Sequence, residues 1–239
     1  MRLDVYFTPL GLTAGDLVGR GVVVIDALRA TTTIISALAN GARAVVPTAS
    51  SEEAVKMTAN LERDGFVLAG ERRYQAIPGF ALGNSPREMT PEEVRGKTVY
   101  LATTNGTPAL VAAQGADPIL VGAAVNFGVL AERAREVFIE RGDLVIICAG
   151  REKQFALEDS YVAGRLVKAV KQRLRRVALN DSAEVAVGLA QRYRDWLAAF
   201  RACEAGRQLK ELNLDEDVAF SAEGDRFSIV PTYVDRHIT

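Results

Sequence analysis

Residues suited to binding anions and metal ions follow four apolar segments of this sequence. Asp26 comes directly after the apolar run 22–25, and Glu71 comes directly after the segment 66–70. Residues 103–107 are rich in threonine, and residues 150–159 begin with glycine and end with two acids. If the four segments are strands of a parallel sheet, their carboxyl ends share one edge, where open α/β sheets bind ligands. The spacing therefore predicts one polar pocket assembled from four turns.

The first turn, residues 26–33, combines an acid, an arginine and the expected start of a helix. A helix N-terminus offers free N–H groups and a partial positive charge, which favour a bound anion. Arg29 adds a guanidinium group that can hold a phosphate through two parallel hydrogen bonds. A plainer interpretation stays open, in which Asp26 caps the helix and Arg29 pairs with it on a solvated surface.

The third turn, residues 103–107, is the best candidate for a phosphate cradle. Its threonines supply hydroxyl groups, and Gly106 lets the backbone approach a ligand closely. The alternative is an ordinary Asn-Gly turn with threonine caps, and the turn at 83–86 has a similar alternative. The predicted substrate-binding residues are Asn84, Ser85, Thr103, Thr104, Asn105, Gly106, Thr107, Gly150 and Arg151.

Four carboxylates of these turns are candidate ligands for a hard cation, namely Asp26, Glu71, Glu158 and Asp159. Mg²⁺ typically takes one or two carboxylates and completes its shell with water and substrate phosphate. Glu158 and Asp159 also suit the first turn of a helix, and capping is compatible with coordination. The predicted catalytic residues are Asp26, Arg29, Glu71 and Asp159, with Mg²⁺ as the expected cofactor.

Motifs of several other hydrolytic mechanisms are absent from the sequence. It has neither a Gly-x-x-x-x-Gly-Lys-Ser/Thr loop nor a Gly-x-Ser-x-Gly elbow. Gln154, not arginine, stands six residues after Cys148, and Leu28 stands where an aspartyl-nucleophile pattern requires a second aspartate. The only histidine, His237, lies near the end of the chain. The expected attacking group is a metal-bound water molecule or Asp26 itself.

The composition is that of one α/β domain with ample core. The chain has 239 residues, of which 49% are hydrophobic, and its 29 basic and 30 acidic residues nearly balance. We expect no nucleic-acid partner, because no basic run occurs, and no membrane span, because no apolar run approaches about 20 residues. Two cysteines form no disulfide framework, and the N-terminus does not resemble a signal peptide. A cytoplasmic protein is therefore expected.

Strand and helix patterns alternate along most of the chain, which predicts a mostly parallel sheet with helices on both faces. A capping box at residues 50–53 predicts a helix to about residue 63, residues 182–211 read as wholly helical, and residues 227–231 read as an edge strand. We expect one domain, 1–239, with α/β halves of about 1–125 and 126–239 as the alternative division.

The sequence resembles the 2-phosphosulfolactate phosphatases, the ComB-like family of coenzyme M biosynthesis. The resemblance lies in residues 24–33, 70–72, 79–86, 103–107, 148–150, 155–159, 216–221, 225 and 230–231. One departure is Ser221, where members of the family often have cysteine. The resemblance implies a three-layer α/β/α fold with a helical C-terminal segment, and Mg²⁺-dependent hydrolysis of 2-phospho-3-sulfolactate to 3-sulfolactate and phosphate.

The expected function is therefore a magnesium-dependent phosphatase for a small anionic phosphate ester. Arg151 and Lys153, or Arg72 and Arg73, are the candidates for binding the sulfonate or carboxylate end, and a solvated basic loop is the alternative. A phosphatase for another phosphorylated hydroxy acid and a non-catalytic anion-binding module stay open as functions. A homo-oligomer is also compatible with the sequence, because the apolar stripe around Trp196 and Phe200 packs either at home or against a second copy.

Overall fold

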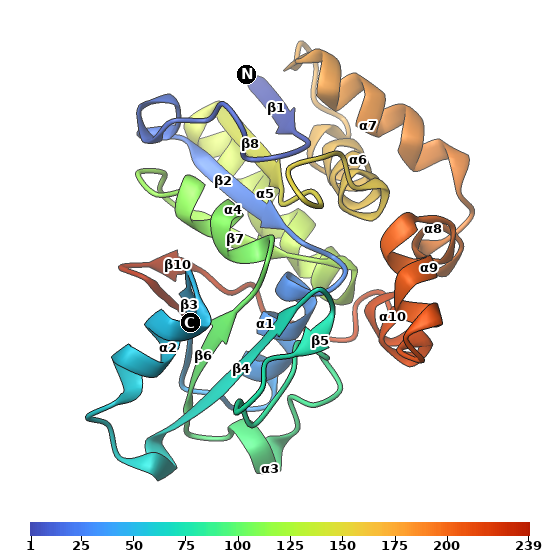
Figure 1. Cartoon of the computed structure of the whole chain (residues 1–239). Helices are drawn as coiled ribbons and strands as arrows, with labels where there is room; N and C mark the ends of the chain where they lie inside the picture. The colour runs from blue at the N-terminus through green and yellow to red at the C-terminus, as the bar shows by residue number, and fades with distance from the viewer.

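The chain forms two β-sheets whose strands run mostly parallel (Figure 1). The computed structural model describes residues 1–239, apart from the side chain of residue 14. The first sheet has five strands in the order β7-β2-β8-β1-β9, and every neighbouring pair is parallel. Its strands are β1 (Arg2–Tyr6), β2 (Gly21–Ile25), β7 (Ile119–Gly122), β8 (Asp143–Cys148) and β9 (Ala178–Leu179).

The second sheet has the order β10-β11-β3-β6-β4-β5. Its three longer strands pair in parallel, whereas β5, β10 and β11 join in antiparallel fashion. Its strands are β3 (Ala44–Thr48), β4 (Phe66–Arg72), β5 (Gln75–Ala76), β6 (Thr98–Ala102), β10 (Tyr233–Val234) and β11 (His237–Ile238). The chain passes from the first sheet to the second and back, so each sheet combines segments that are distant in sequence.

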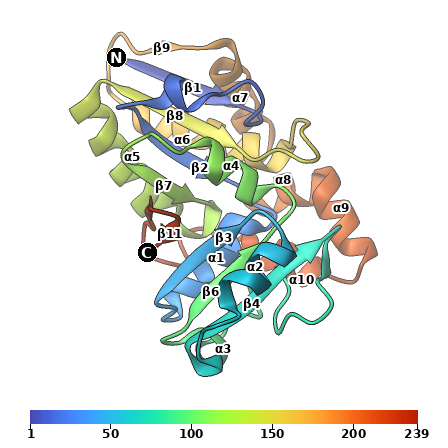
Figure 2. The same cartoon turned by 60° about the vertical axis from the view of Figure 1, so that its left-hand side comes forward.

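Helices cover the outer faces of the sheets and fill the space between them. They are α1 (Ala30–Ala39), α2 (Ser51–Thr58), α3 (Pro91–Val94), α4 (Gly106–Ala112), α5 (Phe127–Arg141), α6 (Leu157–Lys171), α7 (Asp181–Arg192), α8 (Trp196–Ala202), α9 (Glu204–Glu211) and α10 (Asp215–Ser221), with 3₁₀ turns at Ala14–Leu17, Arg63–Gly65 and Ala124–Asn126. Helices α1 and α4 contact strands of both sheets. Helices α8, α9 and α10 lie together at one side of the molecule (Figure 2).

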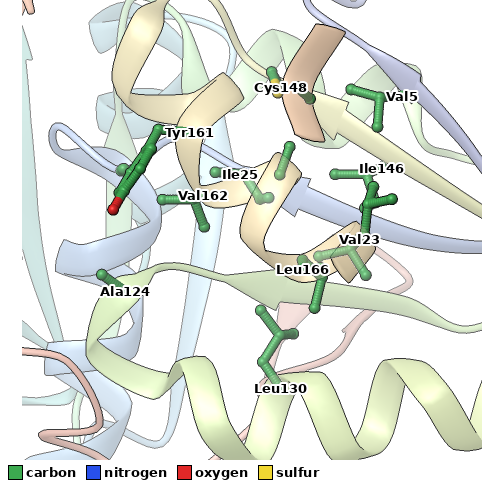
Figure 3. Packing of buried hydrophobic residues seen from close by; sticks show 14 of the residues in the cluster. Val5, Val23, Ile25, Ala124, Leu130, Ile146, Cys148, Tyr161, Val162 and Leu166 are labelled. Atoms are coloured by element: carbon green, nitrogen blue, oxygen red, sulfur yellow. The ribbon is translucent and has the colours of Figure 1, made fainter. Parts of the chain in front are cut away.

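Strict alternation along the central strands divides the core into two layers. In β2, Val23 and Ile25 point into the cluster formed with α5 and α6, whereas Val22 and Val24 point toward α1, α4 and the second sheet. Figure 3 shows the first cluster, where Leu166 of α6 packs among side chains of β2 and β8. Because both faces of this sheet are covered, its central strands β2, β7 and β8 are apolar except at their ends, whereas β1 carries the buried Asp4 in its middle. The ends are therefore the places where polar side chains gather.

The predicted fold class is confirmed, since helices lie on both sides of mostly parallel sheets. The strands form two sheets, however, where the sequence suggested one. The helical stretch 182–211 is broken into α7, α8 and α9, because Asp195 and Cys203 each cap a new helix. Helix α2 ends at Thr58, five residues earlier than predicted.

One further expectation is wrong and another stays untested. The predicted edge strand 227–231 is wrong, because residues 227–231 form no regular strand and only follow β7 through bonds such as Val121 N–H to Pro231 O. The alternative division of the domain near residue 125 stays a prediction. Across the described residues, no helix is both long enough and apolar enough to cross a bilayer.

We expect Leu166→Ala to lower the free energy of unfolding by about 2–5 kcal/mol, because the side chain is fully buried and leaves a cavity. Urea denaturation measures this change. The matched control is Val185→Ala in α7, whose side chain is 58% exposed and whose loss should change stability by no more than about 0.5 kcal/mol. Equal effects of the two substitutions would contradict this assignment of the core.

Candidate active site

A pocket lies where the carboxyl ends of two strands from each sheet meet. The first sheet contributes the turns after β2 and β8, and the second contributes the end of β4 and the turn after β6. Its walls are formed by Asp26, Leu28, Arg29, Glu71, Arg73, Tyr74, Asn84, Thr103, Thr104, Asn105, Arg151 and Glu152. All four turns named from the sequence therefore reach one pocket, although they come from two sheets.

Asp26 directly follows β2 and is almost fully buried. Its carboxylate Oδ1 accepts the Ala30 N–H at 3.3 Å, and the Thr31 hydroxyl bonds to the Asp26 carbonyl at 2.8 Å. Burial, and then the negative charges of Glu158 and Glu71, raise the pKa of Asp26 to about 7. Asp26 therefore both accepts a hydrogen bond at the start of α1 and lines the pocket. The carboxyl group is poised to change charge near neutral pH.

Glu71 connects two walls of the pocket. Its Oε2 accepts the N–H of Tyr74 at 2.8 Å, and its Oε1 accepts the N–H of Thr104 at 2.8 Å. The first bond closes the tight β4–β5 turn, in which Arg73 and Tyr74 both have positive φ. The second bond fixes the loop after β6. One carboxylate thus sets the relative position of two loops of the second sheet.

Asp159, in the first turn of α6, does the same for the first sheet. Its Oδ1 accepts the Ala27 N–H at 2.8 Å, and its Oδ2 accepts the Gly150 N–H at 3.1 Å. Burial raises the pKa of Asp159 well above its usual range, and the charge of Asp26 adds to this. Gly150 has φ +68°, and a Cβ there would collide with the Gln154 carbonyl and lie 3.0 Å from the Phe7 carbonyl. Asp159 and Gly150 therefore shape the loops behind the pocket.

The loop after β6 presents Thr103, Thr104 and Asn105 to the pocket. The Thr103 hydroxyl accepts the Thr107 N–H at 3.2 Å and caps α4. A Cβ on Gly106 would lie 2.5 Å from Ala30 Cβ and 3.0 Å from the Asp26 carboxylate. The glycine therefore lets the start of α4 approach the start of α1.

Arg29 is held in a buried network beside the pocket. Its Nη1 donates to the Asp217 carboxylate at 2.7 Å, and its Nη2 donates to the Tyr74 carbonyl at 3.0 Å. The Ser85 hydroxyl donates to the other oxygen of Asp217 at 2.6 Å. The side chains of Arg29 and Asp217 are 2% and 1% exposed. Helix α10 thereby fixes one turn from each sheet, and Arg29 is not a solvated surface residue.

Two buried polar atoms of residues lining the pocket lack a hydrogen-bond partner within the described part of the chain. They are Nε of Arg29 and Oδ1 of Asn84. A buried polar group without a partner costs about 1–3 kcal/mol, so such atoms are rare unless something else supplies the bond. A polar ligand in the pocket would provide these partners.

The predicted site residues divide into two groups. Those that line the pocket are Asp26, Arg29, Glu71, Asn84, Thr103, Thr104, Asn105 and Arg151. Those that stand outside its lining are Ser85, Gly106, Thr107, Gly150, Glu158 and Asp159. Glu158 lines a neighbouring pocket with Cys203 and Glu204, and Arg151 lies between the two pockets. Burial raises the pKa of Glu158.

The carboxylates of the pocket suit a magnesium ion that shares its ligands with a substrate. Among the described residues, no three Asp, Glu, His or Cys side chains form a group that holds a metal by itself. Asp26 and Glu71 both line the pocket, and a third acid, Glu152, is exposed on the turn after β8. One or two carboxylates, completed by water and phosphate, are a common magnesium set. Mutual repulsion between Asp26 and Glu71 would be relieved by a cation.

Asp217 is the main residue that reasoning from the sequence left without a role. It lies 188 positions from Arg29 and belongs to no local pattern of turn or strand end. The resemblance included residues 216–221 without indicating a function for any of them. Tyr74 was also missed, because the loop that carries it has no periodicity from which its position could be derived.

Comparison with known proteins points to a single family. A model of the 2-phosphosulpholactate phosphatase family matches residues 6–236. A probable 2-phosphosulfolactate phosphatase of Caldanaerobacter subterraneus is 39% identical over 234 residues, which cover 97% of this chain and 95% of the relative. Proteins of the same name from Symbiobacterium thermophilum and Clostridium beijerinckii are 39% and 33% identical, over 94% and 100% of this chain and 96% and 99% of the relative, respectively.

We expect Gly106→Ala to destabilise the protein by about 1–3 kcal/mol, because the new Cβ would press on Ala30 and on the Asp26 carboxylate. Gly188→Ala in α7 is the matched control, since a Cβ there meets open space and alanine favours a helix interior by about 1 kcal/mol. Thermal denaturation of both variants measures the difference. Loss of stability in the control alone would contradict this packing.

A second expectation concerns pH. Because the pKa of Asp26 is raised to about 7 in the folded chain, against about 4 when unfolded, the folded state binds the extra proton between these values. Stability therefore falls as pH rises through this window, and the contribution is constant outside it. Asp26→Asn removes this group, so its free energy of unfolding should fall less steeply from about pH 4 to pH 7.

Urea denaturation at a series of pH values, with EDTA present throughout, measures the slope for the protein and for Asp26→Asn. The introduced amide does not titrate, and the loss of the carboxylate charge also lessens the repulsion felt by Glu158 and Asp159. Both effects flatten the curve. Superimposable slopes for the two proteins would show that Asp26 ionises in the folded chain as it does in the unfolded one.

Proposed function

The chain belongs to the 2-phosphosulfolactate phosphatase family, and we propose that it hydrolyses 2-phospho-3-sulfolactate to 3-sulfolactate and phosphate with the help of Mg²⁺. Relatives that carry this name match the chain over nearly its whole length. The family is one of phosphoric monoester hydrolases. The substrate and the metal requirement are the parts that experiment must test.

The observation that carries this proposal is the meeting of Asp26 and Glu71 in one pocket with arginines around them. Two carboxylates alone would repel a phosphate dianion. A divalent cation between them and the phosphate reverses the sign of the interaction. Phosphoryl transfer depends mainly on positioning and charge neutralisation, and this pocket supplies both kinds of group.

Asp26 and Glu71 would hold the metal ion, and when bound Mg²⁺ would neutralise charge on the phosphoryl oxygens. Thr103, Thr104 and Asn105 would orient the phosphoryl group from the opposite sheet. Glu71 keeps that loop in place through its bond to the Thr104 N–H. The unpaired Nε of Arg29 would donate to an oxygen of the ligand, whereas the unpaired Oδ1 of Asn84 is an acceptor and would need a donor such as a water molecule.

Asp26 also has the chemistry required close to the reacting phosphorus. Its Oδ1 accepts the Ala30 N–H, which leaves Oδ2 available to accept a proton or to attack phosphorus. A carboxylate oxygen next to the reacting phosphorus is suited to accept a proton from an attacking water molecule. The same oxygen would serve as the nucleophile if the reaction proceeds through an aspartyl phosphate. The two routes differ in whether a phosphoenzyme forms.

We further propose that the enzyme works in the cytoplasm and in coenzyme M biosynthesis. Cys148 and Cys203 are both buried and unpaired with each other, which suits a reducing compartment. The proposed place in coenzyme M biosynthesis rests on the family resemblance and depends on the identity of the substrate.

Phosphate release from 2-phospho-3-sulfolactate, with Mg²⁺ and with EDTA, tests the proposal beside a panel of other phosphorylated hydroxy acids. We expect release that EDTA abolishes and that is fastest for the sulfonated ester. Asp26→Asn and Glu71→Gln should each lower kcat/KM on the order of 100-fold or more, because each removes a charge next to the reacting group. Asp117→Asn, an exposed change at the opposite end of the first sheet, is the control.

Three outcomes would change the assignment. Preference for another ester of the panel would keep the chemistry and replace the substrate. Release that is indifferent to EDTA would remove Mg²⁺ from the proposal. Absence of release from every ester would favour a binding module, and calorimetric titration with phosphate would then measure that role. Trapping of a phosphoenzyme by rapid acid quench, lost in Asp26→Asn, would identify Asp26 as the nucleophile.

A further inference from the structure

Three arginines line the pocket, namely Arg29, Arg73 and Arg151, and they differ in how firmly they are held. The substrate proposed above carries a sulfonate and a carboxylate besides its phosphate, and one of these side chains is expected to receive one of the two groups. Of the four basic residues that the sequence suggested for this end, Arg72 and Lys153 do not line the pocket. Lys153 instead lines a separate groove with Pro9, Leu10, Thr104, Asn105, Pro108, Ala112, Ala149 and Glu152.

Arg29 is already committed to the protein. Its partner Asp217 is buried with it, and Tyr74 accepts a further hydrogen bond. Breaking a buried pair of this kind leaves an uncompensated charge and costs about 3–5 kcal/mol. A ligand cannot readily take Asp217's place, so Arg29 supports the pocket wall and offers only its unpaired Nε.

Arg151 is held by a partner that it can exchange. Its guanidinium pairs with the carboxylate of Glu204, the first residue of α9, and the two side chains are 22% and 58% exposed. An ion pair so open to water contributes only about 0–1 kcal/mol. The Tyr74 hydroxyl lies beside the same guanidinium within the pocket. Arg151 is therefore a pocket cation whose present anionic partner is easily displaced.

The backbone that carries Arg151 is rigid. Arg151 N–H bonds to the Gln154 carbonyl at 2.9 Å, and Gln154 N–H bonds to the Arg151 carbonyl at 2.8 Å. Glu152 and Lys153 between them have φ of 48° and 66°, as in a two-residue hairpin turn. Glu152 N–H also bonds to the Asn105 side chain at 3.0 Å. The backbone from which the Arg151 side chain extends is thus tied to the loop 103–107.

We propose that Arg151 binds the sulfonate or the carboxylate of the substrate and releases Glu204 when it does so. This inference rests on the proposed phosphatase function, and it names the residue that selects a phosphate ester with another strong anion. The loop 103–107 would receive the phosphoryl group and Arg151 the sulfonate or carboxylate. Glu204 pairs with the Arg151 guanidinium when no substrate is bound and competes with the substrate for this group.

Four esters separate this role from a general one: 2-phospho-3-sulfolactate, 2-phospholactate without the sulfonate, 2-phosphooxyethanesulfonate without the carboxylate, and ethyl phosphate with neither. Arg151→Met should raise KM for the first ester about 10- to 100-fold, the loss of one charged hydrogen-bonding partner, with little change in kcat. For ethyl phosphate KM should stay within about twofold. Whichever of the two middle esters keeps the sensitivity to Arg151→Met identifies the acid group that is bound.

Glu204→Gln should have the opposite effect. It should lower KM for 2-phospho-3-sulfolactate several-fold and leave KM for ethyl phosphate unchanged. The matched control is the ion pair between Arg141 and Asp117, which is also half-exposed and joins two elements at the far end of the first sheet. Arg141→Met and Asp117→Asn should leave the ratio of KM values between the esters unaltered.

An equal loss on all four esters in Arg151→Met would overturn the inference, as would loss of selectivity in Arg73→Met instead. Calorimetric titration with 3-sulfolactate decides the same point without turnover, since Arg151→Met should weaken its binding and Glu204→Gln should strengthen it. If the unaltered protein releases no phosphate from any ester, the proposed function fails, and the titration still shows whether Arg151 receives the acid group.

Discussion

The hydrogen bonds that the Asp159 carboxylate accepts from Ala27 and Gly150 are the constraint on which the pocket depends. They join the turns that follow β2 and β8. The backbone pairing between these two neighbouring strands stops at that point. Beyond the ladder, nothing in a parallel sheet fixes one turn relative to the next. A buried carboxyl group with two backbone donors does so, because each lost bond would leave a polar oxygen without a partner in the interior. Asp26 and Arg151 are carried by the turns that this bond positions.

Glu71 applies the same principle in the second sheet, where it joins the β4–β5 turn to the loop after β6. The two carboxylates differ in their surroundings, since Asp159 is buried and Glu71 lines the pocket. Burial raises the pKa values of Asp26, Glu158 and Asp159, and for Asp26 the nearby charges of Glu158 and Glu71 add to this. The proposed metal ion would offset the repulsion between Asp26 and Glu71.

Much of this pocket was predictable because its contributors obey a local rule. Asp26 and the threonines after Ala102 directly follow buried apolar strands, Glu71 is the first polar residue near the end of β4, and the end of a parallel strand is where such residues become accessible. What the rule could not supply is how the strands are distributed, since two sheets have the same local pattern as one. The breaks in the stretch 182–211 were hidden for a related reason, because helical periodicity continues across caps such as Asp195.

The contact between Arg29 and Asp217 was beyond any local rule, since it depends on how α10 packs against the turn after β2. Glycine also misled in an instructive way. Gly106 suggests close approach to a ligand, yet the approach in this fold is to Ala30, and the glycine does not line the pocket. A glycine in the sequence suggests that another group approaches the backbone closely, and only the tertiary structure identifies that group.

Burial then decides how the arginines of the pocket divide their roles. Arg29 and Asp217 are removed from water together, so the pair is strong only as long as both partners stay, and it acts as a fixed part of the wall. Arg151 and Glu204 remain in contact with water, which weakens their attraction and makes exchange inexpensive. The same ion-pair chemistry therefore builds the site in one place and leaves it open to a ligand in another. In the sequence both pairs are simply an arginine and an acid. Their solvent exposure distinguishes the structural pair from the exchangeable one.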